Sequence, residues 1–147
     1  MALRMIDHIG IIAHSWGEAS EVLLAKMALE LDLDRTSMPD GNYFAPENTD
    51  IFFVKVGIGQ TRIEVLIPRN NQSGIGRRLE KYGAGLHHIG YGSDDPQADA
   101  AVLRARGLVQ IDLTSGGRGD LRGSATPFFR PASAGGILTE LVVSRES

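Results

Sequence analysis

An internal duplication is the feature of this 147-residue sequence that most constrains its fold. Residues 6–10 read IDHIG and residues 86–90 read LHHIG, and each segment opens a run of strand-forming residues. A second pair, residues 62–66 (RIEVL) and 138–142 (LTELV), carries a glutamate at the same place. Such self-similarity indicates one structural module that is written twice. His8 and His88 are therefore predicted to be equivalent, as are Glu64 and Glu140.

Each half of the sequence reads as a strand, a helix and then about three strands, which predicts an α+β fold. The first helix begins at a capping box formed by Ser15 and Glu18, and the second begins at Asp95 with a proline in its first turn. Four-residue steps predict the apolar stripe of the first helix, Ala19, Leu23, Met27 and Leu31, and a second stripe is expected at Ala98, Ala101, Val102 and Ala105. A short helix over residues 73–81 is expected to link the halves. The expected strands are residues 50–56 and 61–67, a short one near residues 43–44, and residues 108–113, 125–130 and 137–143.

Length and composition limit the class of protein. We expect a single domain over residues 1–147, with module one at about 1–70 and module two at about 84–147. The 42% hydrophobic and 22% charged residues are ordinary for a globular protein, and a net charge of -3 argues against general binding to nucleic acid or to an anionic membrane. The chain has no cysteine, which excludes disulfides, zinc-cysteine sites and a thiol nucleophile. No targeting segment or long apolar run is evident, so a cytoplasmic location is expected.

Strand alternation predicts that the four repeated polar residues share the sheet face that the helices leave uncovered. Ile9 and Ile11 point away from His8 in a strand, and Ile63 and Val65 point away from Glu64. The same parity places Leu141 and Val143 opposite Glu140. Two imidazoles and two carboxylates suit one divalent ion of zinc, cobalt, nickel, manganese or iron. His87 points away from His88 and is expected to be a buried, hydrogen-bonded histidine.

The sequence resembles the methylmalonyl-CoA epimerases of the vicinal oxygen chelate (glyoxalase/bleomycin resistance/dioxygenase) superfamily. The resemblance is carried by residues 6–11, 63–68, 73–89 and 135–141. It implies two paired βαβββ modules that form an incomplete eight-stranded barrel around a metal site, usually in a homodimer. It also implies that His8, Glu64, His88 and Glu140 are the metal ligands. Residues 130–133 read RPAS where relatives often read HPKS.

The implied activity is epimerisation of a 2-substituted malonyl-CoA through a metal-stabilised enolate. Removal of the proton between the two carbonyl groups requires a base, and inversion requires an acid on the opposite side. Glu140 is one candidate and Asp50 is the other. Residues expected to bind the anionic substrate lie in the loop before the last strand, namely Arg118, Arg122, Arg130 and Ser133.

Two other functions fit the same ligand set. A glyoxalase-I-type enzyme would act on the hemithioacetal of a thiol, and only the outer pocket would differ. A non-enzymatic drug-binding protein of the same fold would not be expected to keep all four ligands. An extradiol dioxygenase needs only two histidines and one carboxylate, so Glu64 argues against it.

Overall fold

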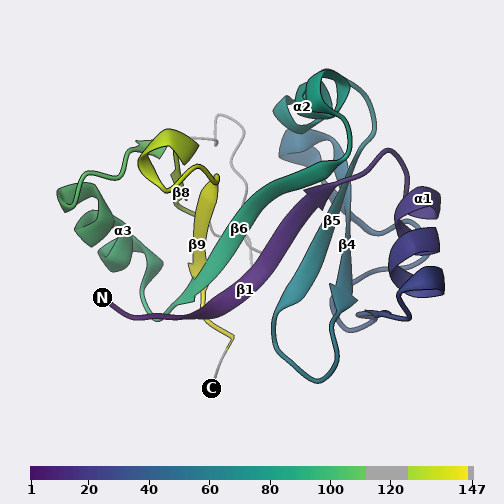
Figure 1. Ribbon diagram of the computed structural model, residues 1–147, viewed down its shortest axis with the longest axis horizontal. Helices are drawn as coiled ribbons and strands as arrows, with labels where there is room; N and C mark the ends of the chain where they lie inside the picture. Colours follow the sequence, from purple (N-terminus) through teal and green to yellow (C-terminus); the bar gives the residue numbers. More distant parts are fainter. Residues whose placement is uncertain (112–125, 146–147) are drawn as a thin grey trace. The chain divides into compact units, whose positions relative to one another are not determined.

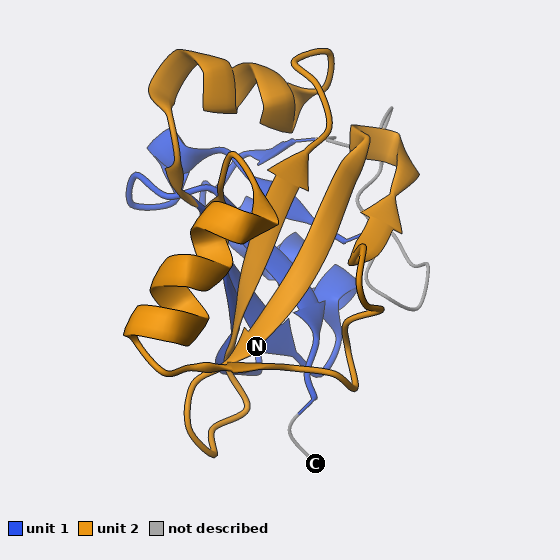
Figure 2. Ribbon diagram, turned by 90° about the vertical axis from the view of Figure 1, so that its right-hand side faces the viewer, with its two compact units in different colours: residues 1–9, 87–147 blue, residues 10–86 orange. Residues whose placement is uncertain are grey.

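The computed structural model describes residues 1–111 and 126–145, in which helices and strands are mixed in the α+β manner expected from the sequence (Figure 1). The chain divides into two compact units (Figure 2). Unit 1 contains Met1–Ile9 and His87–Ser147, and unit 2 contains Gly10–Leu86. The first strand of the chain is therefore split between the units at Ile9 and Gly10.

The elements of the first half of the chain, in order, are β1 (Leu3–Ile12), α1 (Trp16–Ser20), the π-helix η1 (Glu21–Lys26), β2 (Glu30–Leu31), β3 (Asn42–Phe44), the 3-10 helix η2 (Ala45–Glu47), β4 (Thr49–Lys55), β5 (Arg62–Pro68) and α2 (Gly74–Tyr82). Those of the second half are β6 (Gly85–Ser93), α3 (Pro96–Ala105), β7 (Gln110–Ile111), β8 (Phe128–Phe129), the 3-10 helix η3 (Pro131–Ser133) and β9 (Thr139–Val143). None of the helices in the described ranges has the length and apolar content needed to cross a bilayer.

In unit 2 the hydrogen-bonded strand order is β2-β4-β5, and β3 also pairs with β4; in unit 1 the order is β1-β6-β9-β8-β7. β4 and β5 are antiparallel neighbours in unit 2. In unit 1, β9 runs parallel to β6 and antiparallel to β8. This pairing brings the strand that carries Glu140 next to the strand that carries His88.

Helix α1 of unit 2 packs on the sheet face that the sequence predicted, whereas α2 packs on the other face through Ile75 and Leu79. Ser15 accepts a hydrogen bond from the backbone N–H of Glu18 at 3.0 Å, as the capping box requires. Behind this cap, Trp16 stacks on Phe52 with ring centroids 4.2 Å apart. The rest of the cluster joins the helix to β1, β4 and β5 through Ile11, Ala13, Ala19, Leu23, Leu24, Leu29, Val54, Ile63, Val65 and Ile67.

The predicted apolar stripe of this helix is wrong beyond Lys26. The helical turns end there, and Ala28 adopts a φ of 57°, which reverses the chain. The N–H of Leu29 then donates back to the carbonyl of Leu23 at 2.9 Å. Met27 is consequently exposed, and Leu31 lies in β2, a strand that the sequence analysis did not predict.

The helix of unit 1 is correctly placed but buries a different face from the one predicted. Asp95 accepts from the N–H of Ala98 at 3.1 Å and begins α3. Ala100 and Leu103 are buried against β8 and β9, whereas Ala98, Ala101 and Ala105 are exposed. The only leucine of this helix decides the orientation, because burying its larger apolar surface stabilises the fold more than burying alanines.

The remaining expected elements differ mainly in length. The linking helix is confirmed as α2, which ends at Tyr82 with Gly83 as its C-cap, and the short strand near residues 43–44 is β3. The strands expected at 50–56 and 61–67 are β4 and β5, each within one residue. The expected strands at 108–113, 125–130 and 137–143 contain the shorter β7, β8 and β9. Residues 112–125 lie outside the described part of the chain.

Candidate metal centre

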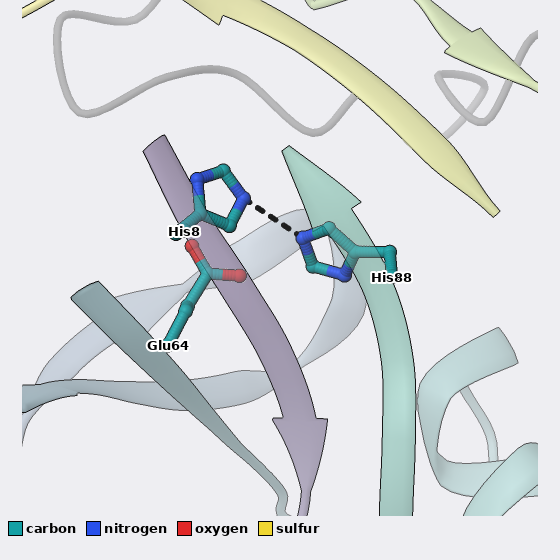
Figure 3. A group of neighbouring side chains, drawn as sticks. All are labelled: His8, Glu64 and His88. Atoms are coloured by element: carbon teal, nitrogen blue, oxygen red, sulfur yellow. Dashed lines mark hydrogen bonds between the residues drawn. The ribbon is translucent and has the colours of Figure 1, made fainter. Parts of the chain in front are cut away.

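Two buried histidines on neighbouring strands of unit 1 form the centre of the site. His8 lies on β1 and His88 on β6, with exposed fractions of 4% and 0%. Their Nε2 atoms face each other at 2.9 Å, and the two rings meet edge to face (Figure 3). Each ring therefore turns its Nε2 toward the other ring, so that one possible ligand atom from each histidine lies in the same small region.

Glu140 supplies a third ligand atom to the same point. Its Oε1 lies 2.9 Å from Nε2 of His8 and 3.3 Å from Nε2 of His88. The parallel pairing of β6 with β9 causes this approach, because Glu140 is the register partner of Gly90, two residues after His88 on the same face. The structure therefore brings together His8, His88 and Glu140, three of the four predicted ligands.

Gly90 makes the room that the imidazole of His8 occupies. A Cβ atom at position 90 would lie 2.2 Å from Cε1 and 2.6 Å from Nε2 of His8. No side chain can be accommodated there unless the imidazole moves. The sequence contained a signal for this role, because a glycine follows both repeated histidines by two residues, at positions 10 and 90.

The outer nitrogen of each histidine is also hydrogen-bonded. Nδ1 of His8 lies 2.8 Å from Oδ2 of Asp7, and Nδ1 of His88 lies 2.8 Å from Nδ1 of His87. The prediction of a buried, hydrogen-bonded His87 is confirmed, and its partner is the adjacent histidine. The sequence analysis missed Asp7, although Asp7 and His87 occupy equivalent positions of the duplication.

The second oxygen of Glu140 is held by Thr126, which the sequence analysis also missed. The Thr126 hydroxyl donates to Oε2 of Glu140 at 2.5 Å, and both residues are buried. Phe128, the register partner of Glu140 on β8, packs its ring against His88 with centroids 5.9 Å apart. These contacts fix the carboxylate so that Oε1 faces the imidazoles.

The chemistry and spacing of the three donor atoms fit a divalent transition metal. Two imidazole nitrogens and one carboxylate oxygen suit zinc, cobalt, nickel, manganese or ferrous iron. Ligand atoms about 2.1 Å from a tetrahedral zinc ion lie roughly 3.4 Å from one another. The observed separations of 2.9 to 3.3 Å require only a small outward movement of the side chains.

Glu64 belongs to unit 2, where its strand parity agrees with the prediction. It is buried on β5, with Phe53 of β4 as its register partner. Its neighbours Ile63 and Val65 point to the opposite face and pack in the cluster that contains α1. Glu64 therefore lies on the face of β5 that is turned away from α1.

Asp50 also belongs to unit 2, and it lies on the other face from Glu64. It shares its parity on β4 with Phe52 and Val54, which pack in the α1 cluster, whereas Phe53 pairs with Glu64. Its carboxylate binds the guanidinium of Arg69 through both oxygens, with N–O distances of 2.9 and 3.1 Å. Asp50, the second candidate acid or base, therefore lies on the face of β4 that packs against α1, away from the face of Glu64.

Of the four predicted substrate-binding residues, Arg130 and Ser133 lie in the part of the chain that the structure describes. Arg118 and Arg122 lie outside the described residues. Arg130 is exposed at the start of η3, and its carbonyl accepts from the Ser133 hydroxyl at 2.9 Å. That hydroxyl also accepts from the N–H of Val109, and Ser133 lines a pocket with Tyr91 and Leu141. The side chain of Ser133 therefore serves a local turn on the α3 side of the sheet, opposite Glu140.

The fold and the cluster define a class of α+β protein in which a duplicated unit supplies histidine and glutamate side chains to a buried cluster that could hold a metal ion. The chain belongs to the glyoxalase/bleomycin resistance protein/dioxygenase superfamily, because the model of that family matches residues 7–122. No curated protein gives a significant match to the sequence.

Several solved structures resemble the whole chain. A variant of Streptomyces coelicolor methylmalonyl-CoA epimerase, in complex with 2-nitronate-propionyl-CoA, is 30% identical over 98% of this chain and 99% of its own, with a TM-score of 0.80. A methylmalonyl-CoA epimerase in complex with methylmalonyl-CoA and NH4+ is 30% identical over 99% of this chain and 97% of its own, also with a TM-score of 0.80. The epimerase from Mycobacterium tuberculosis shares the fold at 23% identity over 96% of this chain and 88% of its own, with a TM-score of 0.78.

Proposed function

We propose that this protein is a metal-dependent isomerase that moves the α-proton of a 2-substituted malonyl thioester, as an epimerase of methylmalonyl-CoA does. The observation that carries the proposal is the convergence of His8 Nε2, His88 Nε2 and Glu140 Oε1 within 3.3 Å of one another in a buried site. The likeness to methylmalonyl-CoA epimerases at 30% identity supports the substrate class. Coenzyme A is the thiol that those relatives bind.

We propose Glu64 as the fourth ligand of the ion. The duplication makes it the equivalent of Glu140, and it is a buried carboxylate on the face of β5 away from α1. Carboxylate oxygens, together with imidazole nitrogens, are donors that divalent ions of this group accept. The native metal is expected to be one of zinc, cobalt, nickel, manganese and iron.

When bound, a divalent ion acts as a Lewis acid that stabilises negative charge developing on substrate oxygens. The chain itself provides the groups that hold and move the proton. Thr126 orients Glu140 so that Oε1 faces the imidazoles, and Oε2 is the atom that we propose to accept the α-proton. Inversion needs a second acid or base on the other side of the carbon. Asp50 is poorly suited to that task because Arg69 engages both of its oxygens.

The anionic end of the substrate requires a cationic contact. Arg118, Arg122 and Arg130 remain our prediction for that contact. Ser133 is not included in this proposal, since its hydroxyl forms hydrogen bonds with the backbone carbonyl of Arg130 and the backbone N–H of Val109.

Deuterium exchange tests the proposed reaction. With methylmalonyl-CoA in deuterium oxide, the metal-loaded protein should introduce deuterium at the α-carbon while it interconverts the two epimers. Glu140→Gln should suppress both processes by roughly 100-fold or more, because it removes the proposed base. Asp50→Asn should leave both rates unchanged, and a loss of about 100-fold would identify Asp50 as the second acid or base.

The other outcomes of this experiment separate the alternative functions. Exchange without inversion would show that only one base operates. Turnover of a glutathione hemithioacetal, with no exchange on any malonyl thioester, would assign the glyoxalase-I-type activity instead. Binding of small molecules without turnover of either substrate would indicate a binding protein of the same fold.

A further inference from the structure

The two histidine ligands are held from outside by chemically unlike partners at equivalent positions of the duplication. The residue before His8 is Asp7, and the residue before His88 is His87. We propose that Asp7 and His87 are positioning residues that keep a proton on Nδ1 of His8 and of His88, so that each Nε2 is presented bare to a divalent ion. This inference rests on the proposed metal site.

At His8 the direction of the outer hydrogen bond follows from the partner. An ionised carboxylate can only accept, so the 2.8 Å contact with Oδ2 of Asp7 requires the proton on Nδ1 of His8. Asp7 is 3% exposed, and Nε of Arg145 lies 3.4 Å from its other oxygen. The guanidinium thus places a positive charge beside the buried carboxyl group that contacts His8.

At His88 the partner can either donate or accept. A neutral imidazole carries one proton, so the 2.8 Å contact between the two Nδ1 atoms needs the proton on one of them only. If Nε2 of His88 binds a metal, its proton must be on Nδ1 and His87 must accept. His87 then carries its own proton on Nε2, which is the opposite tautomer from His8 and His88.

Because Asp7 has a carboxylate and His87 a neutral imidazole, removal of the two side chains is predicted to lower metal affinity by different amounts. Hydrogen bonds to ionised acceptors are about twice as strong as those between neutral groups. Outer partners of this kind typically change metal affinity by roughly 10- to 100-fold. Loss of the Asp7 carboxylate should therefore weaken binding more than loss of the His87 acceptor.

Histidine tautomers provide a readout that a role in packing alone would not produce. Long-range 1H–15N correlation spectra of the full chain, labelled at its four histidines, report which ring nitrogen carries each proton. In the zinc-loaded protein we expect protons on Nδ1 of His8 and His88 and on Nε2 of His87. In the metal-free protein we expect a slowly exchanging Nδ1 proton on His8, which disappears in Asp7→Leu. His14→Gln, at an exposed histidine, is the matched control and should change neither pattern.

Paired variants separate the hydrogen bond from the volume of the side chain. Asp7→Leu and His87→Phe remove the acceptor, whereas Asp7→Asn and His87→Asn keep one. Competition with a chelator should show zinc binding weakened about 10- to 100-fold in the first pair and less in the second. Thermal unfolding of the metal-free variants shows that each one is folded.

Two results would overturn the inference. One is a proton on Nδ1 of His87 in the zinc form, because His88 would then have none to donate. The other is zinc affinity equal to that of the wild type in both acceptor-free variants. A wild type that binds no metal would instead contradict the proposed function, and the Nδ1 proton of His8 in the metal-free protein would still decide whether Asp7 positions the ring.

Discussion

The imidazole of His8 can occupy its place only because residue 90 has no side chain. Its ring atoms lie where a Cβ of residue 90 would have to be, and the same ring is bonded at both nitrogens, to Asp7 on one side and to Glu140 on the other. A small change at position 90 is therefore transmitted directly to a ligand atom. At the scale of single residues, the site depends as much on this glycine as on the side chains that bear nitrogen and oxygen.

Gly90→Ala should abolish tight metal binding while the chain stays folded. The new methyl group would be 2.2 Å from Cε1 of His8, so the imidazole must rotate and withdraw Nε2 from the cluster. Gly59→Ala is a suitable control, because the nearest atom to a Cβ there is 3.8 Å away. Isothermal titration with zinc measures the effect, and wild-type affinity in Gly90→Ala would contradict the placement of His8 over residue 90.

The residues that were predictable are those that the duplication repeats. His8, His88 and Glu140 recur in register, so their chemistry could be recognised from the sequence alone. Thr126 and the role of Gly90 depend on which strands pair, and pairing between segments far apart in the chain is not visible in local patterns. Asp50 shows a related limit, since alternation groups residues by face without telling which face a helix covers.

At the scale of elements, a buried aspartate after β2 supports the part of the sheet that carries Glu64. Asp32, which follows β2, is 1% exposed and accepts from Nε of Arg62 on β5 at 2.6 Å. Its other oxygen accepts from the N–H of Asp34 and of Arg35. These bonds close the turn after a strand of only two residues and tie it to the strand that carries Glu64. The residue pattern of β2 did not predict this strand, because the hydrogen bonds that stabilise it involve Asp32 and Arg62, which lie outside it.

Asp32→Asn should lower the free energy of unfolding of the metal-free protein by about 2 kcal/mol at neutral pH. Burial raises the pKa of Asp32, but the hydrogen bonds from Arg62 and from the N–H of Arg35 outweigh it, and the pKa lies below its ordinary value of 3.8. The unfolded state then binds the proton more readily, so this contribution is present above the ordinary pKa and is lost as the pH falls through the folded-state pKa.

Urea denaturation of wild type and variant over a pH series measures this effect. The difference between the two proteins should shrink as the pH falls below 3.8. The exposed Asp34→Asn should match the wild type throughout. A difference that stays constant into acid would show that the charge of Asp32 is not what stabilises the turn.

At the scale of the whole molecule, the duplication explains why a small chain carries a buried polar centre. Each half of the sequence carries one histidine and one glutamate at matching positions, and β1 contributes residues to both compact units. The α+β class followed from the repeat and the order of its elements, whereas the division of β1 between units did not, since it depends on contacts made by residues 87 onward. The homodimer and the cytoplasmic location expected from the sequence remain predictions, and sedimentation equilibrium measures the first.

The metal content of the purified protein tests the central claim most directly. Elemental analysis after growth in metal-supplemented medium should find about one divalent ion per chain, and His8→Ala and His88→Ala should each lose it, because removal of one ligand opens the site. His14→Ala, at an exposed histidine, should retain the ion. A folded wild-type protein that is metal-free and binds none of zinc, cobalt, nickel, manganese or iron on titration would contradict the account.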